Sequence, residues 1–261
     1  MKNKLFYFLL FTIIITSLSW GSLYFLVTQN QLSFGQPVFM ILFALGGWAP
    51  TFSVFIAIAI AEGKSGFSAY WRRLFRFKVS FWYYLSSLLL LLFLGMVPAV
   101  INGQVSEKFS LLANTSWGMV PVLFVSSLFF GGLEELGWRG FLQHELQKKY
   151  NIWLVYGAVW VIWTVWHLPL FFIPGLSQFN QNFWIFSIYA LFFSLILGWL
   201  YSRTKSIPLA VFTHTLVNTL AAVAYLDFLS KETLHWATVV IMLLTLVGLN
   251  LVFPAEKPKQ K

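Results

Sequence analysis

The chain has 261 residues, of which 59% are hydrophobic and only 10% are charged, and its formal net charge is +9. A soluble domain carries roughly 25% charged residues, and so few charges do not cover this much apolar surface in water. The composition therefore excludes a soluble enzyme, a disordered chain and a nucleic-acid-binding protein, and it leaves a polytopic membrane protein. The sequence has no cysteine, which excludes disulfides and cysteine nucleophiles.

The apolar segments predict an all-α bundle of about eight transmembrane helices, since a helix crosses the hydrocarbon layer in about 20 residues. The expected spans are, in chain order, residues 5–28, 37–62, 81–101, 117–137, 153–173, 182–202, 207–227 and 234–253. The first apolar stretch is too long for a signal peptide, and no A-x-A cleavage site follows it, so we expect a retained helix. We expect residues 1–261 to form a single transmembrane domain, with 254–261 as a short cytoplasmic tail.

The positive charges predict the orientation of these spans. With eight spans, 15 of the 17 Lys and Arg residues fall on one side of the membrane, and only Lys108 and Lys231 fall on the other. Cytoplasmic loops carry an excess of Lys and Arg, so we expect an even number of spans with both termini cytoplasmic. The same asymmetry accounts for the net charge without a polyanion, so the expected surroundings are the lipid bilayer, with no nucleic acid partner.

Residues 64–79, KSGFSAYWRRLFRFKV, form a basic segment in which five cations alternate with aromatic and aliphatic side chains. One interpretation is an amphipathic helix that lies in the inner membrane interface and contacts anionic lipid. The other is an ordinary positive loop with aromatic anchors. The sequence leaves both open.

The fourth span ends in three ionisable residues, Glu134, Glu135 and Arg139. Such residues are rare inside membranes and are functional hypotheses by default. Residues four apart share a helix face, so Glu135 and Arg139 are placed to pair. Glu134 lies about 100° around the helix from Glu135 and is free to face a cavity.

Polar residues in two later spans can reach the same cavity. His167 precedes Pro169, which disturbs the helix and frees backbone groups that need a partner or water. His214 and Asn218 are four residues apart, so both can project into one site. One carboxylate, two imidazoles and one amide can thus converge from three helices.

This set of side chains suits the hydrolysis of an amide bond. A carboxylate and a histidine can hold and deprotonate a water molecule, while a second histidine and an amide can donate hydrogen bonds to an oxyanion. Histidine and glutamate are also zinc ligands, but the HExxH pattern is absent, because His144-Glu145 is followed by Lys148 where a second histidine is required. We therefore expect no cofactor and do not favour zinc.

Counted along each span at 1.5 Å per residue, Glu134 lies about 25 Å from its helix start, His167 about 21 Å and His214 about 10 Å. Straight, perpendicular helices would hold these groups at different depths. Tilted or broken helices must bring them together. The points where this can occur are Gly131-Gly132, Pro169 and Pro208.

Three motifs in this order on separate apolar spans, Glu-Glu-x-x-x-Arg, aromatic-x-x-x-His and His-x-x-x-Asn, resemble the CPBP intramembrane protease family. That family includes the prenyl-protein (CAAX) endoproteases and the bacterial Abi proteins, some of them linked to bacteriocin immunity. The strings EELGWRGFLQ and WHLPLF are similar to its bacterial members. The resemblance covers about residues 117–225, the expected catalytic core. One departure is Trp163, which stands where phenylalanine is more usual and keeps an aromatic wall.

The resemblance implies a glutamate-type intramembrane peptidase that requires no catalytic metal. Its substrate would be a peptide or a membrane protein, prenylated or bacteriocin-like, and its location the bacterial cytoplasmic membrane. The implied roles are water activation by Glu134 and His167, an oxyanion site formed by His214 and Asn218, and structural support from Glu135 and Arg139. Two other functions stay open, a proton-coupled transporter and a non-catalytic immunity or scaffold protein.

Overall fold

The computed structural model describes residues 3–226 and 236–252, and these are helical with no strand among them. The helices are α1 (Lys4–Thr28), α2 (Pro37–Gly47), α3 (Ala49–Ala61), α4 (Gly63–Leu74), α5 (Phe81–Ile101), α6 (Val105–Asn114), η1 (Trp117–Met119), α7 (Val120–Phe130), η2 (Gly132–Glu134), α8 (Glu135–Gly137), η3 (Trp138–Gln143), α9 (His144–Leu146), α10 (Ile152–Trp166), η4 (Leu168–Phe172), α11 (Phe183–Thr204), α12 (Ile207–Ala222) and α13 (Trp236–Val252). The predicted tail, residues 254–261, lies outside the described residues.

The all-α class and the polytopic membrane bundle are confirmed, but the count of about eight spans is not. Among the described residues, five helical segments are long and apolar enough to cross a membrane, and α2 with α3, bent by 49° at their junction, makes a sixth if the pair is one span. Each of the eight predicted segments contains a helix. The seventh, however, is only the 16-residue α12, which is shorter than the roughly 20 residues that a perpendicular crossing needs.

The fourth predicted span is interrupted at the glycine pair. Helix α7 ends at Phe130, and the chain continues through the 3-10 turn η2, the short α8 and the π-helical turn η3. A Cβ on Gly131 would overlap the Asn218 side-chain amide, and a Cβ on Gly132 would overlap the Thr215 hydroxyl. The two glycines therefore let α12 approach the interrupted segment closely.

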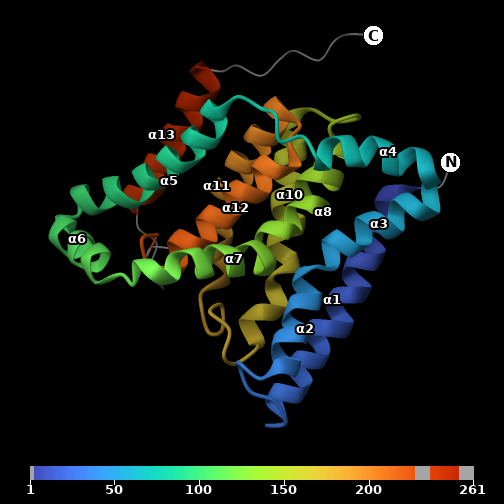
Figure 1. The fold of residues 1–261 in the computed structure, drawn as a ribbon, viewed down its shortest axis with the longest axis horizontal. Coiled ribbons are helices and arrows are strands. Elements are labelled where there is room, and N and C mark those ends of the chain that lie inside the picture. The colour runs from blue at the N-terminus through green and yellow to red at the C-terminus, as the bar shows by residue number, and fades with distance from the viewer. Residues whose placement is uncertain (1–2, 227–235, 253–261) are drawn as a thin grey trace.

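The helices that carry the expected site residues are not parallel, so depths counted along straight, perpendicular helices do not describe them. Figure 1 shows α7 running obliquely to α10 and α12 rather than parallel to them. Helix α10 stops at Trp166, and Pro169 lies in the first turn of the following 3-10 helix η4. Pro208 does not bend a helix, because it lies in the first turn of α12, where the missing N–H has no helical partner to lose.

Side-chain caps set the starts of the helices that carry the histidines. The Asn151 side chain accepts from Leu154 N at the start of α10, and the Ser206 side chain accepts from Leu209 N at the start of α12. Such caps satisfy N–H groups that a helix start leaves without a partner. They fix where each helix begins and therefore which residues face the cavity.

Helix α1 packs into the bundle. The Trp166 indole N–H donates to the Thr16 hydroxyl over 2.7 Å, and the Phe8 ring meets the Trp138 ring edge to face at 5.8 Å. Phe8 and Trp138 are fully buried. The first helix thus supports two segments of the expected catalytic core.

Candidate active site

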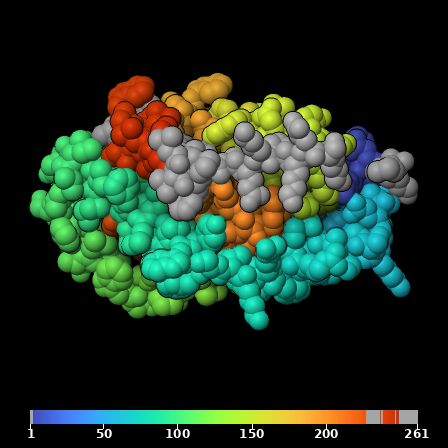
Figure 2. All heavy atoms as spheres, turned by 90° about the horizontal axis from the view of Figure 1, so that it is seen from above, coloured from blue at the N-terminus to red at the C-terminus, as the bar shows by residue number. Residues whose placement is uncertain are grey.

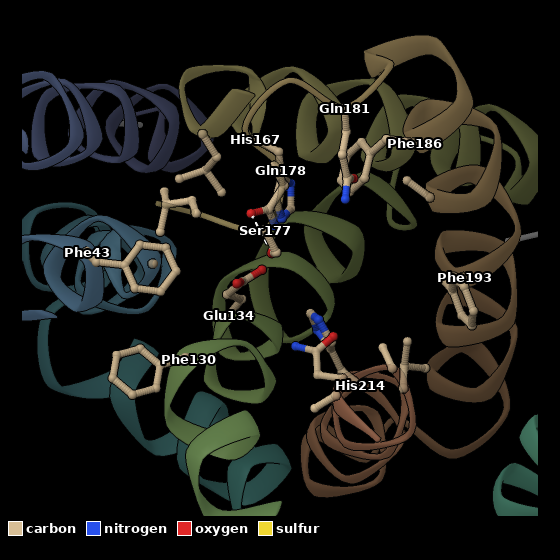
Figure 3. Close-up of a pocket in the computed structure, with 18 of the residues that line it drawn as sticks. Phe43, Phe130, Glu134, His167, Ser177, Gln178, Gln181, Phe186, Phe193 and His214 are labelled. Carbon is tan, nitrogen blue, oxygen red and sulfur yellow. Dashed lines mark hydrogen bonds between the residues drawn. The ribbon is translucent and has the colours of Figure 1, made fainter. Parts of the chain in front are cut away.

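A cavity of about 710 Å³ opens among α2, α7, η2, α10, α11 and α12. It is lined by the four residues expected to be catalytic, Glu134, His167, His214 and Asn218. Figure 3 shows the labelled Glu134, His167 and His214 side chains projecting into this space from three different elements. The structure therefore brings together the side chains that the sequence places on three separate spans.

Glu134 lies at the end of the 3-10 turn η2 and is only 5% exposed. Its Oε2 atom accepts a hydrogen bond from the Trp163 indole N–H over 3.2 Å. This bond fixes one carboxylate oxygen and turns the group toward the cavity, where Figure 3 shows it. The carboxylate does not face lipid.

His167 caps the C-terminus of α10, and its Nδ1 atom lies 2.8 Å from the Trp163 carbonyl oxygen. A carbonyl oxygen only accepts hydrogen bonds, so Nδ1 carries the proton in this contact. In the neutral ring, Nε2 is then the nitrogen with a free lone pair. The end of the helix thereby prepares His167 to act as a base or a hydrogen-bond acceptor.

Glu135 and Arg139 form the ion pair that their spacing predicts, with 2.8 Å between Oε1 and Nη1, and both side chains are fully buried. The same Oε1 atom lies 2.8 Å from His214 Nδ1. Arg139 also donates to the Ser194 hydroxyl over 3.1 Å and lies over the Trp163 ring at 5.0 Å. Glu135 therefore holds a cation and an imidazole in place at one oxygen.

Asn218 lies one turn beyond His214 on α12, and it is partly buried. Its amide nitrogen packs directly over Gly131, at the break before η2. The amide thus lies beside the start of the segment that ends in Glu134. Because an amide nitrogen is a donor, this side chain is able to stabilise negative charge in the cavity.

Two features of the cavity escaped the sequence analysis. Trp163, expected only as an aromatic wall, contacts both Glu134 and His167 through its indole nitrogen and its carbonyl oxygen. The aromatic-x-x-x-His spacing is a signal for the second contact, since the two residues are one turn apart. The loop between η4 and α11 adds Ser177, Gln178 and Gln181 to the cavity wall, and no sequence pattern marks these loop residues.

The described residues contain no group of three or more His, Cys, Asp or Glu side chains arranged to hold a metal ion. Glu134 and the two histidines line one cavity but do not converge as a ligand set. That no cofactor is required stays a prediction.

Comparison with known proteins gives two matches. Residues 115–220 match the family model described as type II CAAX prenyl endopeptidase, Rce1-like. The match covers all six predicted site residues. The chain is also 30% identical over 234 residues to a protein of Methanococcus maripaludis named CAAX prenyl protease 2, with 83% of each chain covered.

Proposed function

The chain belongs to the Rce1-like family of type II CAAX prenyl endopeptidases and is an intramembrane protease, and from this premise we propose that it cuts a prenylated membrane-anchored substrate with a glutamate-activated water. The observation that supports this mechanism is the Glu134 carboxylate, buried in a cavity that two histidines share. The family does not support the transporter or the non-catalytic scaffold.

The first step is activation of the water. Because Trp163 holds Glu134 Oε2, the other carboxylate oxygen is left to accept a hydrogen bond from a water in the cavity. His167 offers Nε2 as a second acceptor, since its Nδ1 proton is donated to a carbonyl. As the water oxygen attacks the carbonyl carbon of the scissile amide, Glu134 takes its proton. A base positioned in this way typically contributes about 10²- to 10⁴-fold to the rate.

The second step needs donors for the oxyanion. The Asn218 amide supplies one. His214 donates from Nε2 only when its ring carries two protons, because Nδ1–H is directed at Glu135. When the intermediate collapses, the C–N bond breaks and the proton held by Glu134 passes to the leaving nitrogen, so that a carboxylic acid and an amine are released.

The cavity has room for a substrate with an apolar part. The aromatic residues Phe43, Phe130, Phe186 and Phe193 line it, and Figure 3 shows their rings around the polar groups. Such a surface suits an isoprenoid or an apolar side chain. The name of the Methanococcus maripaludis relative, CAAX prenyl protease 2, supports the prenylated substrate over a bacteriocin-like peptide.

The orientation completes the proposal. The charge distribution along the sequence supports cytoplasmic termini. Figure 1 shows the start of α1 and the end of α13 at the same end of the bundle. We propose the bacterial cytoplasmic membrane as the location, and a substrate that reaches the cavity from within the bilayer.

Purified protein in detergent should cleave a farnesylated peptide that ends in a CAAX sequence, with the products identified by mass spectrometry. The same peptide without the farnesyl group, and an unprenylated hydrophobic peptide of bacteriocin type, are the comparisons. We expect the farnesylated peptide to have the highest kcat/KM. Equal cleavage of all three would contradict the prenyl preference, and cleavage that survives in Glu134→Gln, His167→Ala and His214→Ala alike would contradict the mechanism.

A further inference from the structure

The basic segment, residues 64–79, presents a charged and aromatic outer surface. It begins in α4 and continues past Leu74 as an irregular chain. It has no acidic residue, and the neighbouring Glu62 is already paired with Lys4. The exposed side chains of the segment include three aromatic residues and four cations: Trp71, Phe75, Phe77, Lys64, Arg72, Arg76 and Lys78.

The inner face of the same segment contacts the first catalytic motif. The fully buried Tyr70 donates from its hydroxyl to the Leu136 carbonyl over 2.8 Å. Leu136 follows Glu134 and Glu135 in the chain. Burial raises the pKa of Tyr70 well above its usual value, so the phenol stays protonated and keeps donating. Arg73 adds a longer contact, 3.4 Å from Nη2 to the Gly140 carbonyl.

A second contact reaches the helix of the third motif. The Ser206 hydroxyl donates to the Arg76 carbonyl over 2.7 Å, and the same oxygen accepts from Leu209 N as the cap of α12. His214 and Asn218 project from that helix. The basic segment is therefore hydrogen-bonded to α8, which directly follows the turn that ends in Glu134, and to the N-cap of α12, the helix of the proposed oxyanion donors.

The position of the segment suits the membrane surface. Figure 1 shows α4 crossing the end of the bundle at which α1 begins and α13 ends, roughly perpendicular to α10 and α11. Figure 2, viewed from that end, shows the cyan segment along one edge, beside the orange start of α12. A helix lying across the end of a membrane bundle, with cations and exposed aromatic rings, is typical of an interfacial helix.

We propose that the basic segment binds anionic phospholipid headgroups and that this binding, passed on through Tyr70 and Ser206, holds the two catalytic elements in their active arrangement. The charge of the segment selects anionic over zwitterionic headgroups, since each Lys or Arg near an anionic surface strengthens binding about fivefold. The exposed aromatic rings fit the headgroup level of the bilayer. Peptidase activity should therefore depend on lipid charge.

Lipid binding can be tested without any substrate. Thermal unfolding of the full chain is measured in detergent micelles that contain phosphatidylglycerol or phosphatidylcholine. We expect phosphatidylglycerol to raise Tm for the wild type and to raise it much less for Arg72→Gln/Arg76→Gln/Lys78→Gln. The matched control, Lys257→Gln/Lys259→Gln/Lys261→Gln, removes the same charge from the tail and should keep the full shift. An equal shift in both triple variants would overturn the lipid site.

Coupling to the catalytic elements is tested by activity. In bilayer discs of phosphatidylcholine, adding phosphatidylglycerol should raise kcat/KM several-fold for the wild type and leave the segment triple variant almost unchanged. Tyr70→Phe removes only the hydroxyl that reaches Leu136. It should keep the Tm shift and lose most of the activation. Full activation in Tyr70→Phe would overturn the coupling.

The two measurements separate this proposal from the proposed function. If no peptide is cleaved under any condition, the function is wrong, but the Tm shift still tests the lipid site. If cleavage occurs at the same rate in both lipids, the function stands and the coupling is wrong.

Discussion

Glu135 and His214 are joined by a 2.8 Å contact between the carboxylate Oε1 and the ring Nδ1, with both side chains buried. This contact connects the first and third motifs, which lie 79 residues apart in the sequence. It orients the His214 ring so that Nε2 is the nitrogen left for the cavity. Glu135, expected to give only structural support, therefore also sets the orientation of the His214 ring.

Replacing Glu134 tests the proposed general base. Glu134→Gln keeps the shape of the side chain but removes the group that takes the proton, so we expect kcat to fall about 10²- to 10⁴-fold. Tm should change little. The matched control is Glu107→Gln, at an exposed position in the first turn of α6, which should retain full activity. A Glu134→Gln variant as active as this control would remove Glu134 from the mechanism.

The Glu135–Arg139 pair should matter strongly for stability. Glu135→Gln leaves a fully buried guanidinium without its counter-charge, and breaking a buried pair costs about 3–5 kcal/mol. We expect a lower Tm in detergent. The double variant Glu135→Met/Arg139→Met removes both charges and should recover much of the stability, yet stay inactive because His214 loses its partner. If the single and the double variant are equally stable, the unpaired Arg139 charge is not the cause of the lower Tm.

Gly131 should be required for activity more than for folding. A methyl group at this position would overlap the Asn218 amide and displace a proposed oxyanion donor. Loss of one such donor reduces kcat about 10²- to 10³-fold, so we expect a loss in that range for Gly131→Ala. The control is Gly157→Ala in α10, where an added Cβ meets nothing within 4 Å. Alanine stabilises a helix by about 1 kcal/mol relative to glycine. Similar activities in the two variants would contradict the packing argument.

Metal removal tests the expectation that no cofactor is needed. Because the proposed water activation uses a carboxylate and an imidazole, incubation with EDTA or 1,10-phenanthroline followed by desalting should leave kcat/KM unchanged. Loss of activity that zinc restores would show that the side chains around Glu134 act as ligands instead.

The fold class, and the polar residues from separate spans that line one cavity, were predictable from local patterns. Long apolar runs predict membrane helices, and i, i+4 spacing places Glu135 with Arg139 and His214 with Asn218. The breaks at Gly131-Gly132 and before Pro169 were also predictable, because glycine and proline act on their own backbone. The number of spans was not, since α12 is too short to be judged by hydropathy alone.

The local sequence thus determined which residues form helices, where two of those helices are interrupted, and which polar side chains share a face. Only the tertiary structure decided that Glu134, His167 and His214 line one cavity, because their relative positions depend on the tilt and packing of whole helices, which no short window of sequence encodes. The contacts of Trp163 and Tyr70 were decided in the same way. Each forms a hydrogen bond to an element distant in sequence, and this bond becomes visible only when the helices are packed.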